Sequence, residues 1–333
     1  MRKLWINVVI SYGCGIYLLA CLIDKFSHYG EYASKAFETN GKHYLFYAYP
    51  VDGKAWIYAA IVMAAVAFYS YSGAGDWILR FLVPVRKPLE NLPSEVDLSP
   101  GSTYVTEYLP AKLAEHNQPK LKINFWVQES PDPNAFAWGK NNIAVSTAIL
   151  ENCTTLQQHA VIMHEVGHLV HSDTRISMVN LWGSFVYSFV TRITSRFLNF
   201  VSGRRAAATT EEAKVRHDNS LVTIISLLVM VMVFAPLVVP IVICAVFSVI
   251  NRHVFAFSSK AQEYAADKFS AEVGLSRDGL IEFLEMLSSI SYKENPIIQA
   301  YFESHPSPRE RINHLRGLNI DESQKLYVGG QNE

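Results

Sequence analysis

The run His164-Glu165-Val166-Gly167-His168 has the residue types and the spacing of a metal-dependent hydrolytic site. Residues four positions apart are neighbours on one face of a helix, so the two imidazoles can reach one zinc ion. Glu165 is turned away from their line, where it can act as the base for a water molecule. The motif therefore predicts hydrolysis of amides. The alternative is a histidine-rich helix face that makes only surface hydrogen bonds, and the neighbouring sequence must decide between the two.

The flanking residues favour a helix. Thr154 and Gln157 fit a Thr-x-x-Gln capping box at its start. Apolar residues surround the proposed ligands, namely Ala160, Val161, Val166, Leu169 and Val170. His171 and Thr174 stand where a metzincin would have a glycine and its third histidine, so this chain is not a metzincin. We expect His171 to lie at the helix end, in a favourable interaction with the helix dipole, and not to bind metal.

A zinc site with two histidines needs a third protein ligand and an open position for water, and Glu263 is the candidate. Glu263 and Asp267 are four residues apart in the run Ser259 to Asp267 and share one helical face. Asp267 would accept a hydrogen bond from the far ring nitrogen of a ligand histidine and so fix its tautomer. The alternative is an ordinary solvated acidic face. The missing third ligand favours the functional interpretation.

Further motifs follow in a defined order. They are Asn134-Ala135-Phe136-Ala137-Trp138-Gly139, Ile143-Ala144-Val145-Ser146-Thr147, His305-Pro306 and Arg311-Ile312. With the two motifs above, they make most of the chain resemble the HtpX-like membrane metalloproteases, which are gluzincins related to the CAAX prenyl proteases. The resemblance implies one zinc ion per subunit, held by His164, His168 and Glu263, with Glu165 as the base. It also implies an α+β membrane protein, with a mostly helical catalytic domain, a small β-sheet and about four transmembrane helices.

The segment before the zinc helix predicts a strand meander. Residues 121–127 partly alternate like a half-buried strand, and a turn is expected at 139–142, after a second extended segment. Gluzincins present an exposed edge strand to which a peptide adds by main-chain hydrogen bonds. The resemblance implies that Asn134, Ala135 and Phe136 form this edge. The alternative is a structural hairpin whose aromatic side chains fill the core.

His305 and Arg311 match positions of the family near the C-terminus. A histidine or a cation near the zinc can stabilise the oxyanion of the tetrahedral intermediate. We expect Arg311 to have a structural role or to support a ligand, for example by pairing with an acidic residue, and His305 remains a candidate for an active-site role. Three tyrosines are further candidates for oxyanion donors that the sequence cannot rank: Tyr264, Tyr292 and Tyr301.

The composition indicates an integral membrane protein. Of the 333 residues, 50% are hydrophobic and only 18% are charged, and the apolar residues are concentrated in blocks. Trp5 to Ile23 and Ala55 to Gly73 are uncharged runs of 19 residues each, close to the ~20 residues needed to cross a bilayer. The alternative for the first run is a cleaved signal peptide, but its apolar stretch continues past a possible lipoprotein cleavage site at Cys21.

Basic residues predict the orientation of these spans. Arg2 and Lys3 precede the first run, and Arg80, Arg86 and Lys87 follow the second. Positive residues favour the cytoplasmic side, so we expect the N-terminus and the catalytic segments to lie in the cytoplasm. The expected location is the bacterial inner membrane.

A second membrane region is expected between the zinc ligands. Because the two histidines and Glu263 must meet at one metal ion, the chain between them crosses the bilayer an even number of times. The resemblance implies a hairpin of about 176–195 and 221–250, although the basic residues between these runs are unusual for a periplasmic loop. The alternative is a surface helix followed by a re-entrant segment, which would expose kinked backbone to lipid. We therefore prefer four spans.

These expectations divide the chain into four parts. They are a membrane hairpin at 1–73, a catalytic segment at 74–175, the second hairpin at 176–250, and a catalytic segment at 251–333 that carries Glu263 and ends in helices. The net charge of −1 argues against nucleic acid as a partner. The four cysteines predict no disulfide framework. The expected partners are polypeptide substrates, membrane proteins among them, and the lipid bilayer.

Together these features predict a zinc metalloendopeptidase of a membrane. Zinc acidifies its water and polarises the scissile carbonyl, while Glu165 takes the proton of the water and passes it to the leaving amine. The resemblance implies quality control of misfolded membrane proteins in a stress response. The alternatives are a dedicated processing protease for one peptide or prenylated tail, and a zinc-stabilised scaffold or chaperone without catalysis. Glu165 argues against the scaffold, because a structural site has no use for a carboxylate there.

Overall fold

The fold is that of a computed structural model, which describes residues 2–28, 51–76, 85–86, 96–99, 102–201, 238–289 and 306–318. The chain forms two compact units, each assembled from segments that are far apart in the sequence. The first unit comprises Met1–Trp5, Tyr69–Val179 and His253–Glu333, and the second comprises Ile6–Phe68 and Asn180–Arg252.

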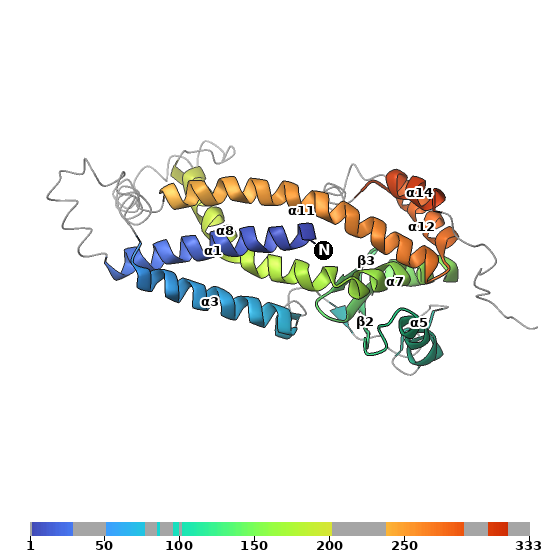
Figure 1. The fold of residues 1–333 in the computed structure, drawn as a ribbon. Coiled ribbons are helices and arrows are strands. Elements are labelled where there is room, and N and C mark those ends of the chain that lie inside the picture. The colour runs from blue at the N-terminus through green and yellow to red at the C-terminus, as the bar shows by residue number, and fades with distance from the viewer. Residues whose placement is uncertain are drawn as a thin grey trace, which may run out of the picture. The chain divides into compact units, whose positions relative to one another are not determined.

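The second unit is built from helices (Figure 1). These are α1 (Arg2–Ser27), α3 (Gly53–Ser72) and the adjoining parts of α8 (Asp173–Val201) and α11 (Val238–Glu272). A segment of 23 residues in α1 and the whole of α3 are long and apolar enough to cross a membrane. They correspond to the two spans predicted near residues 5–23 and 55–73.

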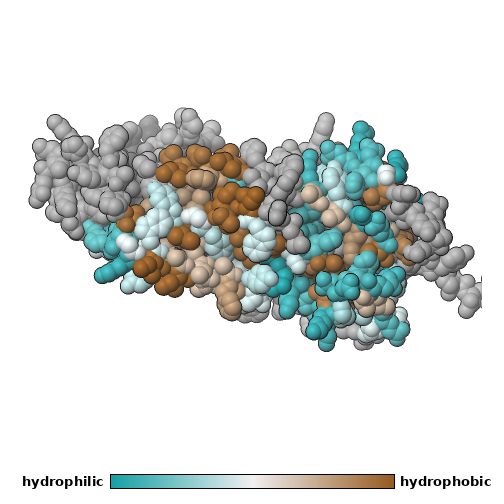
Figure 2. Space-filling view, viewed as in Figure 1, coloured by the Kyte–Doolittle hydropathy of each residue, from teal (hydrophilic) through white to brown (hydrophobic). Residues whose placement is uncertain are grey.

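Buried polar side chains join the helices of the second unit. Ser11 of α1 donates a hydrogen bond to Asn180 Oδ1 of α8 (2.6 Å) and accepts one from Asn251 Nδ2 of α11 (3.0 Å). Large apolar side chains face outward from these helices, among them Phe68 of α3 and Phe185 of α8. Figure 2 shows the resulting brown surface. Polar side chains thus lie between the helices of the second unit, whereas many of its large apolar side chains lie on the outside.

The helices α8 and α11 are longer than the runs expected at 176–195 and 221–250. α8 continues without a break from Asp173 to Val201, and α11 continues through the charged residues that follow Ile250. Both helices thus run past the apolar sequence, because a change in polarity marks a change of environment and not the end of a helix. Residues 202–237 lie outside the described residues, so the second hairpin stays a prediction.

The first unit contains a four-stranded sheet in its described part. The strands are β1 (Val85–Arg86), β2 (Asn124–Gln128), β3 (Ala135–Trp138) and β4 (Asn142–Ser146), in the order β1-β2-β4-β3. β2 and β4 are parallel, whereas the other two pairs are antiparallel. β4 is buried along its whole length because strands flank it on both sides. The turn expected at 139–142 closes the β3–β4 hairpin, and β3 is an edge strand.

Shorter helices surround this sheet. They are the π-helix η1 (Tyr104–Tyr108), α5 (Leu109–Glu115), α6 (Thr147–Asn152), α7 (Thr155–Val170), α12 (Arg277–Ser289) and α14 (Pro308–Arg316). The predicted capping box of α7 is confirmed, since Thr154 and Gln157 bond each other's backbone N–H. α7 packs against β3, β4 and α12, and most of its residues are buried. The HEVGH motif therefore lies in the core of the unit and not on a surface helix.

Candidate metal centre

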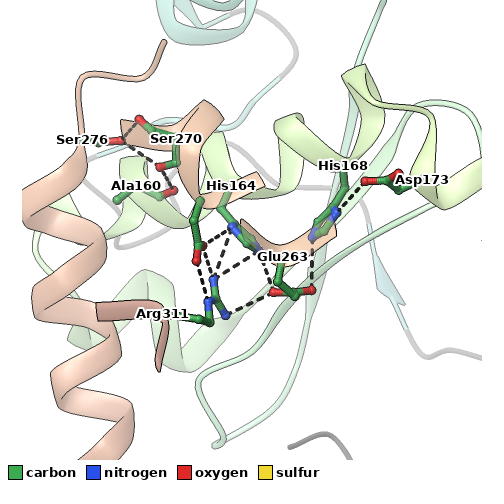
Figure 3. Close-up of polar contacts among 9 residues, drawn as sticks. Ala160, His164, His168, Asp173, Glu263, Ser270, Ser276 and Arg311 are labelled. Carbon is green, nitrogen blue, oxygen red and sulfur yellow. Dashed lines mark hydrogen bonds and ion pairs between the residues drawn. The ribbon is translucent and has the colours of Figure 1, made fainter. Parts of the chain in front are cut away.

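Three of the predicted residues converge between α7 and α11. His164 and His168 lie one turn apart on α7, with ring centroids 4.8 Å apart, and Glu263 reaches them from α11 (Figure 3). Glu263 Oε2 lies 3.4 Å from His164 Nε2, and Glu263 Oε1 lies 3.5 Å from His168 Nε2. One ligand atom from each residue falls within 4.8 Å of the other two, so all three can hold one metal ion.

The other nitrogen of each ring faces an aspartate. His164 Nδ1 lies 2.9 Å from Asp267 Oδ1, as the sequence predicted for one of the histidines. His168 Nδ1 lies 3.5 Å from Asp173 Oδ2, and Gln262 of α11 donates to the other oxygen of Asp173 (3.3 Å). Asp173 was not predicted from the sequence. Its only local signal is an acidic residue in the first turn of α8, which is also typical of ordinary helix starts.

Arg311 of α14 pairs with the acidic side of this cluster. It donates from Nε to Asp267 Oδ2 (3.0 Å), and its Nη1 lies 3.3 Å from Glu263 Oε2. The side chain is 7% exposed, so the guanidinium neutralises carboxylates that have little access to water. This arrangement agrees with a structural or supporting role for Arg311, and Figure 3 shows it beside Glu263 and away from His168.

The close approach of α11 to α7 depends on Gly167. A Cβ atom at this position would lie 3.1 Å from both Ala266 Cα and Phe269 Cβ of α11, which is tighter than ordinary packing. A second contact lies about two turns from His168, where Ser270 Oγ of α11 donates to the Ala160 carbonyl (2.8 Å). The glycine inside the HEVGH motif therefore permits the helix packing that brings Glu263 to the histidines.

The charges of the site fit a cation. Within the described residues, the site holds one buried guanidinium, that of Arg311, and four buried carboxylates: Glu165, Glu263, Asp267 and Asp173. Burial, and at His164 also the guanidinium, lowers the imidazole pKa values, but the carboxylates outweigh this, so the pKa of His168 is well above its ordinary value and that of His164 is raised. Two imidazoles and one carboxylate are the donor set of many catalytic zinc sites. A divalent cation would balance the excess negative charge of the carboxylates. Without the cation, protons on the two imidazoles balance it.

Some of the remaining candidate residues lie in the described part of the structure and others do not. Glu165 is buried on α7 next to His164. His171 caps the C-terminus of α7 against Phe269, and burial lowers its pKa, so the charged ring that interacts best with the helix dipole is disfavoured. Tyr264 is partly exposed and lies against the ring of His314 (4.5 Å). His305, Tyr292 and Tyr301 lie outside the described residues.

The expected substrate edge also lies next to this site. Asn134 precedes β3, its N–H donates to Ser146 Oγ (3.0 Å), and its carbonyl accepts from the Ser146 N–H (2.9 Å). Trp138 is buried against Trp126, whereas Phe136 is partly exposed. The alternative reading of the aromatic side chains as core therefore holds for Trp138. The backbone of β3 remains an edge that packs against α7.

Comparison with known proteins agrees with this geometry. The family model of peptidase family M48 matches residues 103–319. A protease HtpX homolog of Streptococcus uberis is 25% identical over 246 residues, which cover 67% of this chain and 75% of the relative. The protease HtpX of Haemophilus ducreyi is 30% identical over 208 residues, or 58% and 65% of the two chains.

Among solved structures, S. mikatae Ste24p matches with a TM-score of 0.42 and 17% identity, over 95% of this chain and 67% of that one. The M48 match covers both metal-binding segments, the edge strand and α14. The resemblance that the sequence motifs indicated is thereby confirmed, and the chain belongs to peptidase family M48, as an HtpX-like metalloprotease.

Proposed function

We propose that this chain is a zinc-dependent endopeptidase of a membrane, with one zinc ion held by His164, His168 and Glu263. The observation that carries the proposal is the orientation of the two imidazoles. Each Nε2 faces one oxygen of Glu263, and each Nδ1 faces an aspartate. Histidines that bind zinc almost always give their second ring nitrogen to such a partner, which fixes the tautomer. Membership of family M48 supports the same function.

In the proposed mechanism Glu165 moves the proton. Zinc bound by the three ligands would supply a Lewis acid for the scissile carbonyl and for the attacking water. Glu165 takes the proton of that water and passes it to the leaving amine. Asp267 and Asp173 hold the rings of His164 and His168 in place. Arg311 lowers the pKa of Asp267 against the effect of burial and pairs with Glu263. Each charged group near the metal thus has a defined task.

The edge strand β3 is proposed to bind the substrate. An extended peptide that adds to a sheet edge uses main-chain hydrogen bonds, which are the same for every sequence. β3 is the last strand in the sheet order, and it packs against α7, the helix that carries Glu165. A peptide on β3 would therefore run beside the base. Broad sequence tolerance suits quality control of misfolded membrane proteins, which we propose as the role.

The second unit is proposed to lie in the membrane with four spans. Its described helices expose large apolar side chains not only on α1 and α3 but also on α8 and α11, for example Phe189 and Val246. The buried side chains of Ser11, Asn180 and Asn251 are joined by hydrogen bonds. Helices in lipid associate through such bonds. We propose a bacterial inner membrane, with the catalytic unit on the cytoplasmic side.

The catalytic proposal is tested with the full-length protein in detergent, loaded with zinc and offered an unfolded substrate such as casein. Glu165→Gln should keep its zinc and lose activity by a factor of about 10² to 10⁴, the usual contribution of a general base. Glu129→Gln is the matched control, because Glu129 is an exposed carboxylate paired with Arg86 of β1 at the other end of the sheet. Equal cleavage by wild type and Glu165→Gln contradicts the mechanism. Inactivity of the zinc-loaded wild type favours a scaffold.

The topology is tested separately by a reporter inserted between Arg204 and Lys214. Four spans with a cytoplasmic catalytic unit place this insertion on the periplasmic side. A cytoplasmic signal there excludes the four-span arrangement and leaves the catalytic proposal untouched. The position is chosen because it lies between the two apolar runs of the sequence.

A further inference from the structure

The turn that ends the edge strand β3 is held by side chains from two other elements of the first unit. Asp76 lies just beyond the end of α3, and its Oδ2 accepts hydrogen bonds from the Lys140 N–H (3.0 Å) and from Asn142 Nδ2 (3.4 Å). On the other side, Thr174 Oγ1 at the start of α8 donates to the Gly139 carbonyl (2.7 Å). Both the N–H and the C=O side of this turn are therefore fixed by other segments.

Gly139 is required at this position for two separate reasons. Its φ of +64° is a conformation that residues with a side chain rarely adopt. In addition, a Cβ atom at Gly139 would lie 2.0–2.1 Å from the carboxylate atoms of Asp76. The Asp76 carboxylate thus fills the space that any other residue at 139 would need. Burial raises the pKa of Asp76, although the Lys140 N–H and Arg175 each act to lower it. The carboxylate has therefore lost part of its hydration in this position.

The same contacts lead to the metal centre. Thr174 follows Asp173, whose carboxylate faces His168. The next residue, Arg175, lies over the Tyr71 ring at 4.1 Å and donates to the Tyr71 carbonyl (3.0 Å) at the end of α3. The first turn of α8 therefore touches a metal-binding histidine, the end of β3 and the end of the second candidate membrane span.

We propose that Asp76 is a positioning residue for peptide binding, which fixes the end of β3 so that its edge keeps one register for an added substrate strand. The inference rests on the proposed function. A strand that slips by one residue turns every side chain and every main-chain donor to the other side, so a template for peptide addition must be held at its ends. Asp76 acts through β3 and does not touch the reacting atoms. The hydrogen bonds that it secures form on substrate binding and persist in the transition state, so their loss raises KM and leaves kcat nearly unchanged.

The test uses the full-length, zinc-loaded protein with a fluorogenic peptide. Asp76→Ala removes a charged acceptor of the turn and should raise KM about tenfold, since such a bond contributes on the order of one power of ten. Asp76→Asn keeps the shape and one acceptor oxygen, so its KM should rise less than that of Asp76→Ala. Glu129→Ala, at the β1 end of the sheet, should leave KM unchanged. A wild-type KM in Asp76→Ala, or a loss confined to kcat, overturns the inference.

A double-mutant cycle tests the contact itself. Gly139→Ala adds both backbone strain and a collision with Asp76, whereas Gly73→Ala adds comparable strain at φ +88° with its Cβ at an ordinary 3.6 Å from Asp76 Oδ2. Gly139→Ala should raise KM more than Gly73→Ala does, and this excess should vanish in the Asp76→Ala background. An excess that persists without the carboxylate overturns the inference. If Asp76→Ala does not fold, Gly139→Ala and Asp76→Asn still report KM.

The failures of this inference and of the proposed function are distinct. A wild type that cleaves no peptide contradicts the proposed function, and the role of Asp76 falls with it. A wild type that cleaves, with Glu165→Gln inactive and Asp76→Ala at wild-type KM, contradicts only the role of Asp76. Zinc content is measured in every variant. A loss of zinc in Asp76→Ala would overturn the inference, because it would show that the contacts of Asp76 with the turn support the metal centre through Thr174 and not the substrate edge.

Discussion

The two units of this protein bury polar groups of different kinds. In the first unit the buried groups around the metal centre are ionisable and lie opposite one another, as with Asp267 and Arg311. In the second unit the buried groups that join α1, α8 and α11 are neutral, with Ser11 joining Asn180 to Asn251. Its buried carboxylate, Asp24, lies near the end of α1 and pairs with Lys25 (3.3 Å). A desolvated charge is costly in hydrocarbon, whereas hydroxyl and amide groups can link helices there at little cost. The difference indicates that charged groups surround the metal centre, whereas neutral polar groups join α1, α8 and α11 to one another.

The outer surfaces of the two units differ in the opposite sense. Phe68 of the second unit is 77% exposed and Val9 is 69% exposed, and Figure 2 shows brown surface over its helices. The first unit buries its large apolar residues, such as Ile143 and Ile162, and presents a mostly hydrophilic surface. The second unit thus exposes large apolar side chains, whereas the first unit buries them. This difference agrees with the proposal that only the second unit lies in lipid.

Arg311→Leu should give the largest loss of stability. Removing the guanidinium leaves Asp267 buried without its cation, and breaking a buried pair in this way typically lowers the free energy of unfolding by about 3–5 kcal/mol. The measurement is unfolding of the zinc-free protein in detergent. Arg316→Leu is the matched control, because Arg316 lies on the same helix but forms an exposed pair with Glu285 (2.8 Å) that contributes about 0–1 kcal/mol. Equal losses in the two variants would remove the distinction between buried and exposed charge.

Asp173→Ala should weaken metal binding about 10- to 100-fold, the usual effect of losing the partner of a ligand histidine. The affinity is measured by competition with a chelator of known strength. Glu272→Ala serves as the control, since Glu272 is an exposed partner of Lys268. An unchanged affinity would mean that Asp173 only stabilises the start of α8 as an acidic first-turn residue.

Much of α7 could be predicted from the sequence because its signals are local. The Thr154 capping box and the positions of His164, Glu165 and His168 depend on residues at most four positions apart, and the helix forms as those signals indicate. A strand at β2 and the turn at Gly139 were likewise predictable. The half-buried alternation expected of that strand was wrong, because Phe125, Trp126 and Val127 are all buried where β2 lies between two other strands. Local patterns define where an element lies and which residues share a face.

The residues that the sequence did not predict depend on contacts between elements. Nothing in the sequence around Asp173 or Asp76 distinguishes them from other acidic residues, because their roles arise from packing against His168 and Gly139. Glu263 could be selected only because the motif lacked a third ligand and because several motifs resembled a family. The role of Gly167 could not be predicted for the same reason. A glycine within a helix is expected only to destabilise it, and the benefit of Gly167 depends on its packing against α11.

Ser11→Ala tests the neutral side of the comparison. It removes the hydroxyl that bridges Asn180 and Asn251, and hydrogen bonds between helices in membranes average about 0.6 kcal/mol, with a maximum near 1.7. The loss measured by unfolding in detergent should therefore be well below that of Arg311→Leu. Ser184→Ala is the control, because Ser184 is partly exposed and its hydrogen bond within the described part of the chain stays inside its own helix, to the Leu181 carbonyl (2.8 Å). A loss as large as that of Arg311→Leu would show that neutral polar groups in the second unit carry the stability that we assign to charges in the first.

The smallest expected effect concerns Glu310, an exposed charge at the start of the helix that carries Arg311. The hydrogen bond from the Ser307 N–H holds the pKa of Glu310 below its ordinary value, and the charge of Lys260 makes a smaller contribution in the same direction. A lowered pKa in the folded state means that the charge stabilises the protein above the ordinary carboxyl pKa of about 4.3, and that this stabilisation is lost as the pH falls through the lowered value. Glu310→Gln keeps the acceptor of the capping box without the charge, so its thermal midpoint should lie slightly below that of the wild type at neutral pH and converge with it in acid. Ser307→Ala should lower the midpoint at every pH, since it removes the side-chain cap itself. A gap between wild type and Glu310→Gln that persists in acid would mean that the charge is immaterial, and that burial alone separates Arg311 from the other charges of its helix.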